Sequence, residues 1–559
     1  MKNQRSSKWF QAPEYYGMAR RAWLRSEGFP ADVFDGKPII GICNSWSELT
    51  NCNLHLRDVA TAVKRGVLAA GGVPLEFPTI SLGELFMMPT AMLFRNLMAM
   101  DVEESIRANP LDGVVLLCGC DKTTPAQLMG AASVNIPTIV VPGGPMMAGQ
   151  YRGQRLGSGT DGKKLFDLYS MGKITDEEWS EVEGCIARTT GHCTVMGTAS
   201  TMTSLAEVLG MSLPGCANIP APDSRRYAMA ELSGRMIVEM IGTDRIPSKI
   251  MTREAFENAI TALMALGGST NAVVHLIAIA GRLGIRLTLD DFDRISRRTP
   301  CVVNVKPSGE FLMEELFHAG GVPAVMNRIA DLLHPGGLTV NGKPPGENLA
   351  NTPSCDDRVI RPRENPIYSE GGIAVLYGNL APNGAVIKQT AATPKLLQHR
   401  GRAHVFETRD QMLTEVERED LPIDKDTVLV MRNCGPKGAP GFPEWGHIPM
   451  PRKLMREGVT DVVRISDARM SGTSYGTVVL HISPESAIGG PLAIVQTGDE
   501  IVLDVAGRKL ELVLSQEEIE ARLKKFTPPP RHYERGYGRL FLDHVTQAHL
   551  GCDFDFLRP

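Results

Sequence analysis

Short apolar runs alternate with amphipathic segments along the first part of the chain. The runs at 37–46, 111–119 and 136–144 are rich in Val, Ile and Leu and are bounded by Gly or Pro. This pattern is typical of strands buried on both faces of a parallel sheet. Between them, residues 55–72 carry apolar side chains at helical spacing and end on a Gly pair suited to a helix C-terminus. We therefore predict α/β organisation, with strands and helices alternating over the first two thirds of the chain.

A second helical pattern covers residues 253–285 and is interrupted by Gly-Gly-Ser-Thr-Asn at 267–271. Glycines inside such a pattern indicate a bend or a new helix start, here predicted to lie near a site. From about residue 335 the chain becomes rich in Gly, Pro and Asn, which indicates a boundary. We accordingly place a large α/β domain with parallel sheets at 1–365 and a second domain at 366–559.

The second domain shows a different pattern of short apolar runs between turn-rich loops. Such runs occupy 426–433, 460–467 and 476–484. Residues 498–515 have the pattern of a β-hairpin that turns at 506–508. The pattern predicts a smaller, β-rich, barrel-like C-terminal domain.

Composition narrows the class of protein. The 559 residues are 43% hydrophobic and 22% charged, with a mean hydropathy of -0.09, so the chain can bury a large core. A net charge of -4 and the absence of a Lys/Arg run argue against nucleic-acid binding. The sequence contains neither a signal-like apolar block near its start nor an apolar run of about 18 residues, so we expect a cytoplasmic protein without membrane contact. Its 11 scattered cysteines do not have the pattern of a disulfide framework.

The candidate chemistry lies where the apolar run at 111–119 ends. Cys118, Cys120, Asp121 and Lys122 stand there, and ligands of open α/β sheets bind beyond the carboxyl ends of the strands. Thiolates suit iron-sulfur clusters or zinc, whereas carboxylates suit magnesium or manganese. The Cys-x-Cys spacing alone matches no standard zinc or ferredoxin pattern, so two buried thiols remain the simpler interpretation.

Other candidates also have plain structural interpretations. Cys52 and Cys193 could be packed as small hydrophobic residues. Glu84 could cap a helix, and His55 and His192 are typical of hydrogen-bonded core histidines. From these residues alone, ligands and ordinary core residues both remain possible.

Residues 157–164, GSGTDGKK, nearly match a phosphate-binding loop. The preceding GQYRGQRL at 149–156 is polar rather than strand-like, and Lys164 stands where Ser or Thr would hold magnesium. We therefore do not expect nucleotide binding.

Six ordered motifs resemble the dihydroxy-acid and sugar-acid dehydratases, a family that includes 6-phosphogluconate dehydratase. They span nearly the whole chain and comprise the segment at 44–84, LDGVVLLCGCDKTTPA, GHCTVMGTASTM, ALGGSTNAVVHL, GPKGAPGFPEWG and SDARMSGTSYG. The order and number of these motifs make the resemblance far more specific than any one of them. The family forms homodimers and homotetramers, and the resemblance implies the same here.

The resemblance implies two metal groups. An iron-sulfur cluster, with 2Fe-2S favoured over 4Fe-4S, would be held by Cys52, Cys120 and Cys193, leaving Cys43 and Cys118 as non-ligands. Magnesium would be held by Glu84, Asp121, a carbamylated Lys122 and Glu444. Carbamylation is chemically reasonable because an ammonium cannot bind a cation whereas a lysine carbamate offers an anionic oxygen.

The resemblance also implies a reaction. Three protein ligands leave one iron open for the C3 hydroxyl of a 2,3-dihydroxy acid, and magnesium would bind its carboxylate and C2 hydroxyl. The base would be the alkoxide of Ser471, with Thr473 near the substrate. Without the resemblance, Ser-Gly-Thr at 471–473 indicates only a tight turn. Because these residues fall in both domains, we expect the site between them.

The substrate stays open between two classes. The motifs are nearer to the sugar-acid branch, which acts on L-arabinonate, D-xylonate or D-gluconate. Leu54, however, resembles the branched-chain enzymes and could close an apolar pocket for 2,3-dihydroxyisovalerate. An iron-sulfur electron carrier or a structural zinc protein would instead need a closed ligand set.

Overall fold

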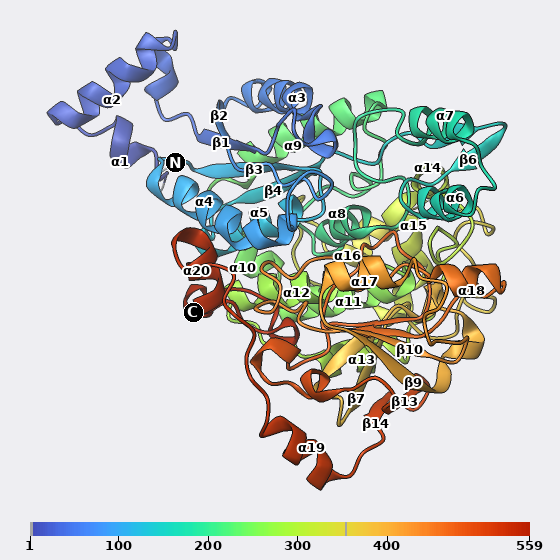
Figure 1. Ribbon diagram of the computed structural model, residues 1–559. Coiled ribbons are helices and arrows are strands. Elements are labelled where there is room, and N and C mark those ends of the chain that lie inside the picture. Colours follow the sequence, from blue (N-terminus) through green and yellow to red (C-terminus); the bar gives the residue numbers. More distant parts are fainter. Residues whose placement is uncertain (1–3, 351, 353–354) are drawn as a thin grey trace.

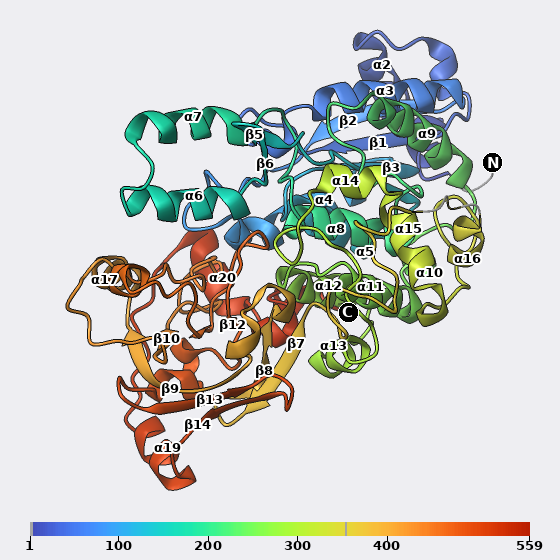
Figure 2. The same ribbon diagram turned by 90° about the vertical axis from the view of Figure 1, so that its right-hand side faces the viewer.

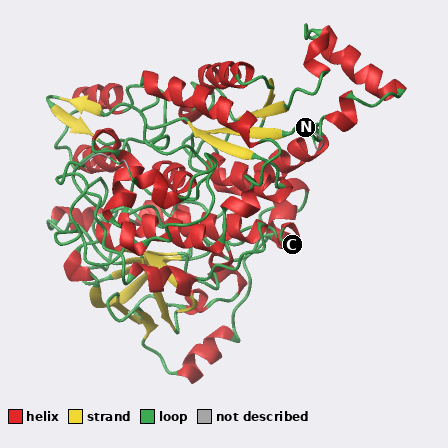
Figure 3. Ribbon diagram, turned by 180° about the vertical axis from the view of Figure 1, so that it is seen from behind, coloured by secondary structure: helices red, strands yellow, loops and turns green. Residues whose placement is uncertain are grey.

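The computed structural model describes residues 4–350, 352 and 355–559. Two β structures lie at opposite ends of the molecule, and helices fill the space between them (Figure 1). Coloured by secondary structure, the parallel sheet, a small hairpin and the barrel stand apart from one another within a mostly helical body (Figure 3). This arrangement confirms the predicted α/β fold with a β-barrel at the C-terminal side.

The first β structure is a parallel sheet of four strands in the order β2-β1-β3-β4. Its strands are β1 Ile39–Asn44, β2 Val73–Pro78, β3 Gly113–Cys118 and β4 Thr138–Pro142. Helices α3 (Leu56–Ala69) and α9 (Ser224–Met240) cover one face, and α4 (Arg95–Ala108) and α5 (Thr123–Val134) cover the other (Figure 1). Double coverage explains why β1, β3 and β4 are buried along their whole length and are mostly apolar. The three predicted strands and the predicted helix at 55–72 are confirmed.

The alternation of strands and helices ends at β4, so its predicted extent over two thirds of the chain was wrong. The segment 149–156, which we did not expect to contain a strand, forms the hairpin of β5 (Gly149–Tyr151) and β6 (Gln154–Leu156). A two-stranded ribbon at the surface needs no apolar face, which is why its polar sequence was misleading. Helices α6 (Thr160–Ser170) and α7 (Asp176–Ile186) follow and lie beside each other at one side of the molecule (Figure 2).

Helices make up most of the chain from there to the barrel. The predicted helix interruption is confirmed, because α11 (Arg253–Ala265) ends before the glycines and α12 (Asn271–Arg282) begins after them. The other helices before the barrel are α1 Ser7–Phe10, α2 Tyr15–Ser26, α8 Thr198–Val208, α10 Pro247–Ile250, α13 Leu289–Ser296, α14 Met313–His318, α15 Gly321–Arg328 and α16 Pro345–Leu349. Among the described residues, no helix combines the length and the apolar character needed to cross a membrane.

The second β structure is a closed barrel in the order β10-β11-β12-β8-β7-β14-β13-β9. Its strands are β7 Ala374–Gly378, β8 Ala381–Ile387, β9 Gln398–Phe406, β10 Val428–Met431, β11 Arg464–Ser466, β12 Val478–Leu480, β13 Glu500–Asp504 and β14 Lys509–Leu512. The predicted hairpin is confirmed, with Leu503 paired to Leu510. We did not predict β7 to β9. Gly and polar residues break the apolar pattern of β8 and β9, whereas β7 is a short apolar run that the sequence analysis passed over. Helices α17 Arg409–Glu415, α18 Arg452–Arg456 and α19 Gln516–Leu523 surround the barrel.

The C-terminal tail returns to the sheet region after the barrel. Helix α20 (Gly536–His544) lies near α4 and α5 (Figure 1). The buried guanidinium of Arg95 donates to the carbonyls of Gly551 and Cys552 at 3.0 and 2.8 Å. Arg282 pairs with Asp553 at 2.6 Å, and both side chains are fully buried. The tail thus supplies hydrogen-bond acceptors to Arg95 and an ion-pair partner to Arg282, both of which are buried.

Candidate active site

The candidate residues of the sheet region gather at the carboxyl edge of the parallel sheet. Cys52 follows β1, Glu84 follows β2, and residues 120–122 follow β3 directly. Beyond β4, Pro145 forms a bridge with His192, the neighbour of Cys193. All four strands therefore direct the chain into one site, as ligand sites of open α/β sheets require.

The thiol cluster, Cys52, Cys120 and Cys193, is assembled by close backbone contacts. A Cβ on Gly119 would lie 2.4 Å from the Cys52 carbonyl oxygen, so only glycine lets the two loops approach this closely. The Cys120 amide also donates to Asn53 Oδ1 at 3.1 Å. Cys193 is positioned by the β-bridge between Pro145 and His192, next to which the Met146 amide donates to the His192 carbonyl at 2.8 Å.

The electrostatics of the thiol cluster show that the three sulfurs lie close together. A hydrogen bond with Cys120 is the largest cause that raises the pKa of Cys52, followed by burial and by the neighbouring Cys193. Burial raises the pKa of Cys193 to about 11, against a hydrogen bond from Ser158. These pKa shifts favour the neutral thiol form of Cys52 and Cys193. A soft cation that displaces their protons fits this donor set, because coordination makes the thiolate.

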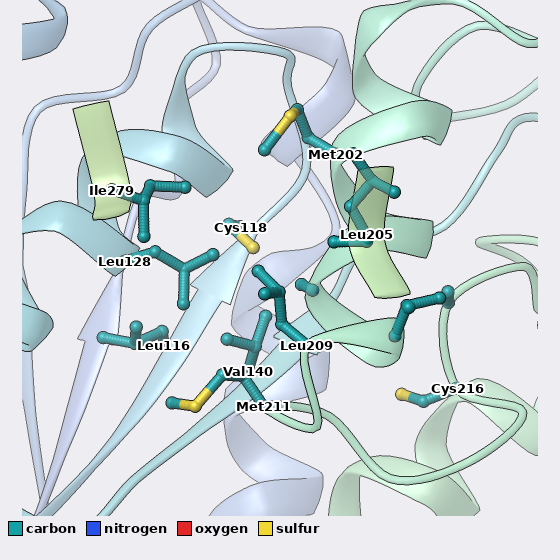
Figure 4. Close-up of a cluster of buried hydrophobic side chains, with 14 of the residues drawn as sticks. Leu116, Cys118, Leu128, Val140, Met202, Leu205, Leu209, Met211, Cys216 and Ile279 are labelled. Atoms are coloured by element: carbon teal, nitrogen blue, oxygen red, sulfur yellow. The ribbon is translucent and has the colours of Figure 1, made fainter. Parts of the chain in front are cut away.

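Cys118 has a different environment from Cys120, although only Gly119 separates them. Its side chain points among Leu128, Leu209 and other apolar side chains (Figure 4). Burial raises the pKa of Cys118 to about 12. Cys43 is equally buried, in the same core, and both are free thiols. Their placement in the core agrees with the expected non-ligand role.

The carboxylate cluster consists of Glu84, Asp121, Lys122 and Glu444. One oxygen from each of the three carboxylates lies within 4.8 Å of the others. The fully buried Lys122 points into their midst, with Nζ at 3.0 Å from Glu84, 2.6 Å from Asp121 and 3.3 Å from Glu444. Cys120 Sγ lies 3.5 Å from Asp121 Oδ1, so the thiol and carboxylate clusters adjoin.

Three further side chains hold the carboxylates in place. Arg469 donates to Glu444 at 3.0 Å and to Thr90 Oγ1 at 3.1 Å, and Thr90 in turn donates to Glu84 at 2.6 Å. Asn271, the first residue of α12, donates to Glu444 at 3.2 Å. This network links Glu84 of the sheet region to Glu444 of the barrel region.

The charges in the carboxylate cluster favour a cation. Burial disfavours the ionised form of Glu444, but Lys122 and Arg469 outweigh it and lower its pKa to about 2. Burial and Arg469 act against the charge of Lys122, yet the three carboxylates raise its pKa above the ordinary value. Three carboxylates meet here, and the cationic Lys122 and Arg469 contact them directly, while Lys163 adds a weaker favourable charge at Glu444. Oxygen donors at this spacing fit a hard divalent cation.

The turn at residues 471–474, which carries the predicted catalytic serine and is called the catalytic turn below, follows β11 of the barrel. Ser471 Oγ and Thr473 Oγ1 lie 3.0 Å apart, and the Thr473 amide donates to Ser471 Oγ at 3.4 Å. The Ser474 amide donates to the Ser471 carbonyl at 3.0 Å and closes the turn. The tight turn expected from the sequence is therefore present, and it presents two hydroxyls next to each other.

The plain interpretations of the other candidates also agree with the structure. His55 Nε2 lies 2.8 Å from the Gly143 carbonyl, and His55 and His192 are buried. Burial lowers the pKa of both histidines, which makes them neutral core residues. Glu84 also accepts from the Ala91 amide at the start of a short 3-10 helix, so helix capping and membership of the carboxylate cluster coincide.

Sequence reasoning missed several residues that complete the site. Asn271 and Arg469 stand inside two of the quoted motifs, which was the available signal, but nothing in the spacing showed that both reach Glu444. Ser158 and Lys163 belong to the loop at 157–164, which we considered only as a nucleotide motif.

The chain is similar in sequence to known dehydratases over almost its whole length. The family model for the N-terminal part of dihydroxy-acid/6-phosphogluconate dehydratases matches residues 37–348, and the one for the C-terminal part matches 358–552. The chain is 53% identical to L-arabonate dehydratase of Azospirillum brasilense, covering 99% of this chain and 96% of the relative. It is 48% identical to 6-deoxy-6-sulfo-D-gluconate dehydratase of Pseudomonas putida, with the same coverage. It is 41% identical to dihydroxy-acid dehydratase of Saccharolobus solfataricus, over 96% of this chain and 97% of the relative.

Proposed function

The chain belongs to the dihydroxy-acid/6-phosphogluconate dehydratase family and is a dehydratase, and we propose that it converts a sugar acid into the 2-keto-3-deoxy acid. The identity to sugar-acid dehydratases, 48–53%, exceeds the 41% identity to a dihydroxy-acid dehydratase. L-Arabinonate, D-xylonate and D-gluconate are the candidate substrates.

The single observation that carries this proposal is the adjacency of the two clusters and the catalytic turn. Cys120 Sγ lies 3.5 Å from Asp121 Oδ1, and Asn271 donates both to Glu444 and to the carbonyl of Met470, which precedes Ser471. The thiol cluster would hold an iron-sulfur cluster, and the carboxylate cluster would hold magnesium. When bound, the two groups would supply Lewis-acid contacts, magnesium to the carboxylate and C2 hydroxyl and iron to the C3 hydroxyl. Thiolates and carboxylates are the ligands that each metal prefers.

Lys122 would take part as its carbamate. As an ammonium it occupies the space between the carboxylates and repels a cation. As a carbamate it would present an anionic oxygen to the same space. Arg469 and Asn271 would then keep Glu444 oriented toward the cation, while Thr90 does the same for Glu84.

Ser471 would act as the base. Its deprotonated Oγ takes the proton from C2, and the hydroxyl of Thr473, 3.0 Å away, can donate to that oxygen and hold it in place. The electron pair of the C2–H bond forms the C2–C3 double bond, and the C3–O bond breaks. The C3 hydroxyl would leave and take up the proton held by Ser471, forming water and restoring the deprotonated serine, and the enol would become the 2-keto acid by moving its hydroxyl proton to C3.

The test is a keto-acid assay with metal-reconstituted enzyme over L-arabinonate, D-xylonate, D-gluconate and 2,3-dihydroxyisovalerate. We expect turnover of at least one sugar acid at a higher kcat/KM than of the branched acid. Leu54, which is 37% exposed beside Cys52, is the feature that favours the branched-chain alternative. Turnover of 2,3-dihydroxyisovalerate alone would establish that alternative and reject the proposal.

A further inference from the structure

The loop at 157–164, Gly-Ser-Gly-Thr-Asp-Gly-Lys-Lys, lies against the candidate site. Thr160 Oγ1 donates to the Thr473 carbonyl at 2.6 Å. Gly159 has a φ of +83°, and a Cβ there would lie 2.4 Å from Thr473 Oγ1. Ser158 Oγ accepts from the amide of Thr194, the residue after Cys193, at 2.8 Å. The segment that resembles a phosphate-binding loop therefore packs on the catalytic turn and on the thiol cluster together.

Lys163, in the first turn of α6, reaches into this region. Its Nζ donates to Ser474 Oγ, the last residue of the catalytic turn. Burial is the main influence that lowers the pKa of Lys163, while the charges of Glu444, Cys193 and Asp167 act in the opposite direction and Arg464 adds to the lowering. Lys163 thus faces one member of each cluster as well as the catalytic turn.

The ammonium of Lys163 lacks an ion-pair partner among the described residues, since no carboxylate oxygen lies within 4.0 Å of it. Neighbouring charges are already paired or hydrogen-bonded. Arg464 is held by Asp461 at 3.1 Å, and Asp167 accepts from Tyr475 at 3.3 Å. A largely enclosed cation without a counter-charge is unfavourable unless a ligand supplies oxygen atoms to it.

We propose that Lys163, together with Ser474, binds the oxygen-bearing tail of the substrate beyond C3 and selects sugar acids against branched-chain dihydroxy acids. This inference rests on the proposed function, because that function places C1 to C3 of the substrate at the two clusters. An oxygen-rich tail can accept from the ammonium. The methyl groups of 2,3-dihydroxyisovalerate would instead leave a charged donor unpaired, which is how polar sites reject apolar analogues.

The experiment compares kcat/KM for L-arabinonate and 2,3-dihydroxyisovalerate in the wild-type enzyme, Lys163→Met and Lys163→Gln. Methionine keeps the length and removes the charge and the donor. We expect the ratio of sugar-acid to branched-acid kcat/KM to fall about ten- to a hundredfold in Lys163→Met, the scale of one hydrogen bond to a charged group. Lys163→Gln retains a donor and should recover part of the ratio.

The adjacent Lys164 provides the matched control. Lys164 is exposed, with Nζ 5.2 Å from the Tyr475 ring centroid, so Lys164→Met should keep the wild-type ratio. Equal losses for both substrates in Lys163→Met and Lys163→Gln, or an unchanged ratio, would overturn the inference. If the wild-type enzyme turns over no sugar acid, the proposed function itself fails, and that result is distinguishable because it appears before any substitution. Melting temperature and iron content identify variants that do not fold.

Discussion

The thiol cluster and the carboxylate cluster lie beside each other but are assembled differently. The three thiols come from loops at one edge of a single sheet, and their positions are fixed by contacts such as the one between Gly119 and the Cys52 carbonyl. The carboxylate cluster needs Glu444 from the barrel region, held by Arg469 and by Asn271 of α12. The thiol cluster therefore depends on the sheet region alone, whereas the carboxylate cluster depends on the packing of the barrel region against the sheet region. A substitution in one cluster should therefore leave metal binding by the other cluster intact.

The largest expected effect is in the thiol cluster. Cys120→Ser should lose iron-sulfur absorption and all dehydratase activity, because a hard hydroxyl is a poor ligand for iron-sulfur clusters. Cys118→Ser, two residues away but inside the apolar core, should keep both, apart from a loss of stability. Absorption spectra and acid-labile sulfide measure the outcome. Bleaching by Cys118→Ser with a coloured Cys120→Ser would show that the ligand assignment is wrong.

Lys122→Arg tests the carboxylate half. Treatment with a chelator that leaves the iron-sulfur absorption intact should abolish wild-type turnover, and added magnesium should restore it. Lys122→Arg should stay inactive at any magnesium concentration, because arginine keeps the positive charge and forms no carbamate ligand. Its absorption spectrum should match that of the wild type. A fully active Lys122→Arg enzyme would contradict the role proposed for this lysine.

Ser471→Ala should lower kcat by roughly two to four powers of ten, the usual range for general acid-base catalysis. The hydroxyl is contributed by the barrel, so the thiol cluster and its spectrum should be unaffected. Exchange of the C2 deuteron of the substrate with water, followed by NMR, should disappear with turnover. Near-normal exchange in the alanine variant would assign proton removal to another group.

The smallest effect is expected at the link between the two regions. Arg469→Lys keeps the charge but cannot bridge Glu444 and Thr90 as the guanidinium does. We expect magnesium affinity to weaken about ten- to a hundredfold, measured by titrating activity with magnesium. Iron content should remain that of the wild type. A parallel loss of iron would show that the two halves are not separable.

Much of the fold was predictable because local pattern and burial agree. Continuous apolar runs correctly predicted β1, β3 and β4. The glycines at 267–268 correctly predicted that a new helix, α12, begins shortly after them. Strands β7 to β9 and the hairpin β5–β6 were missed, because closure of the barrel and exposure at the surface override an apolar pattern. The candidate metal ligands of the site were predicted from the resemblance to the dehydratase family, not from the spacing of the residues. Lys163 and Arg469 escaped prediction because their partners, Ser474 and Glu444, are fixed only by tertiary packing.

The return of the C-terminal tail has a consequence for how the protein is made. Arg95 and Arg282 leave the ribosome long before Gly551, Cys552 and Asp553, yet both guanidinium groups end up buried against these residues. Until the tail is synthesised, Arg282 has Glu103 as an ion-pair partner at 3.0 Å, but both arginines lack the further partners that the tail supplies, and burying a cation with incomplete partners is costly. We therefore expect the packing around Arg95 and Arg282 to be completed only after the C-terminal tail has been synthesised. A truncated product would be exposed to cellular proteases through the same defect.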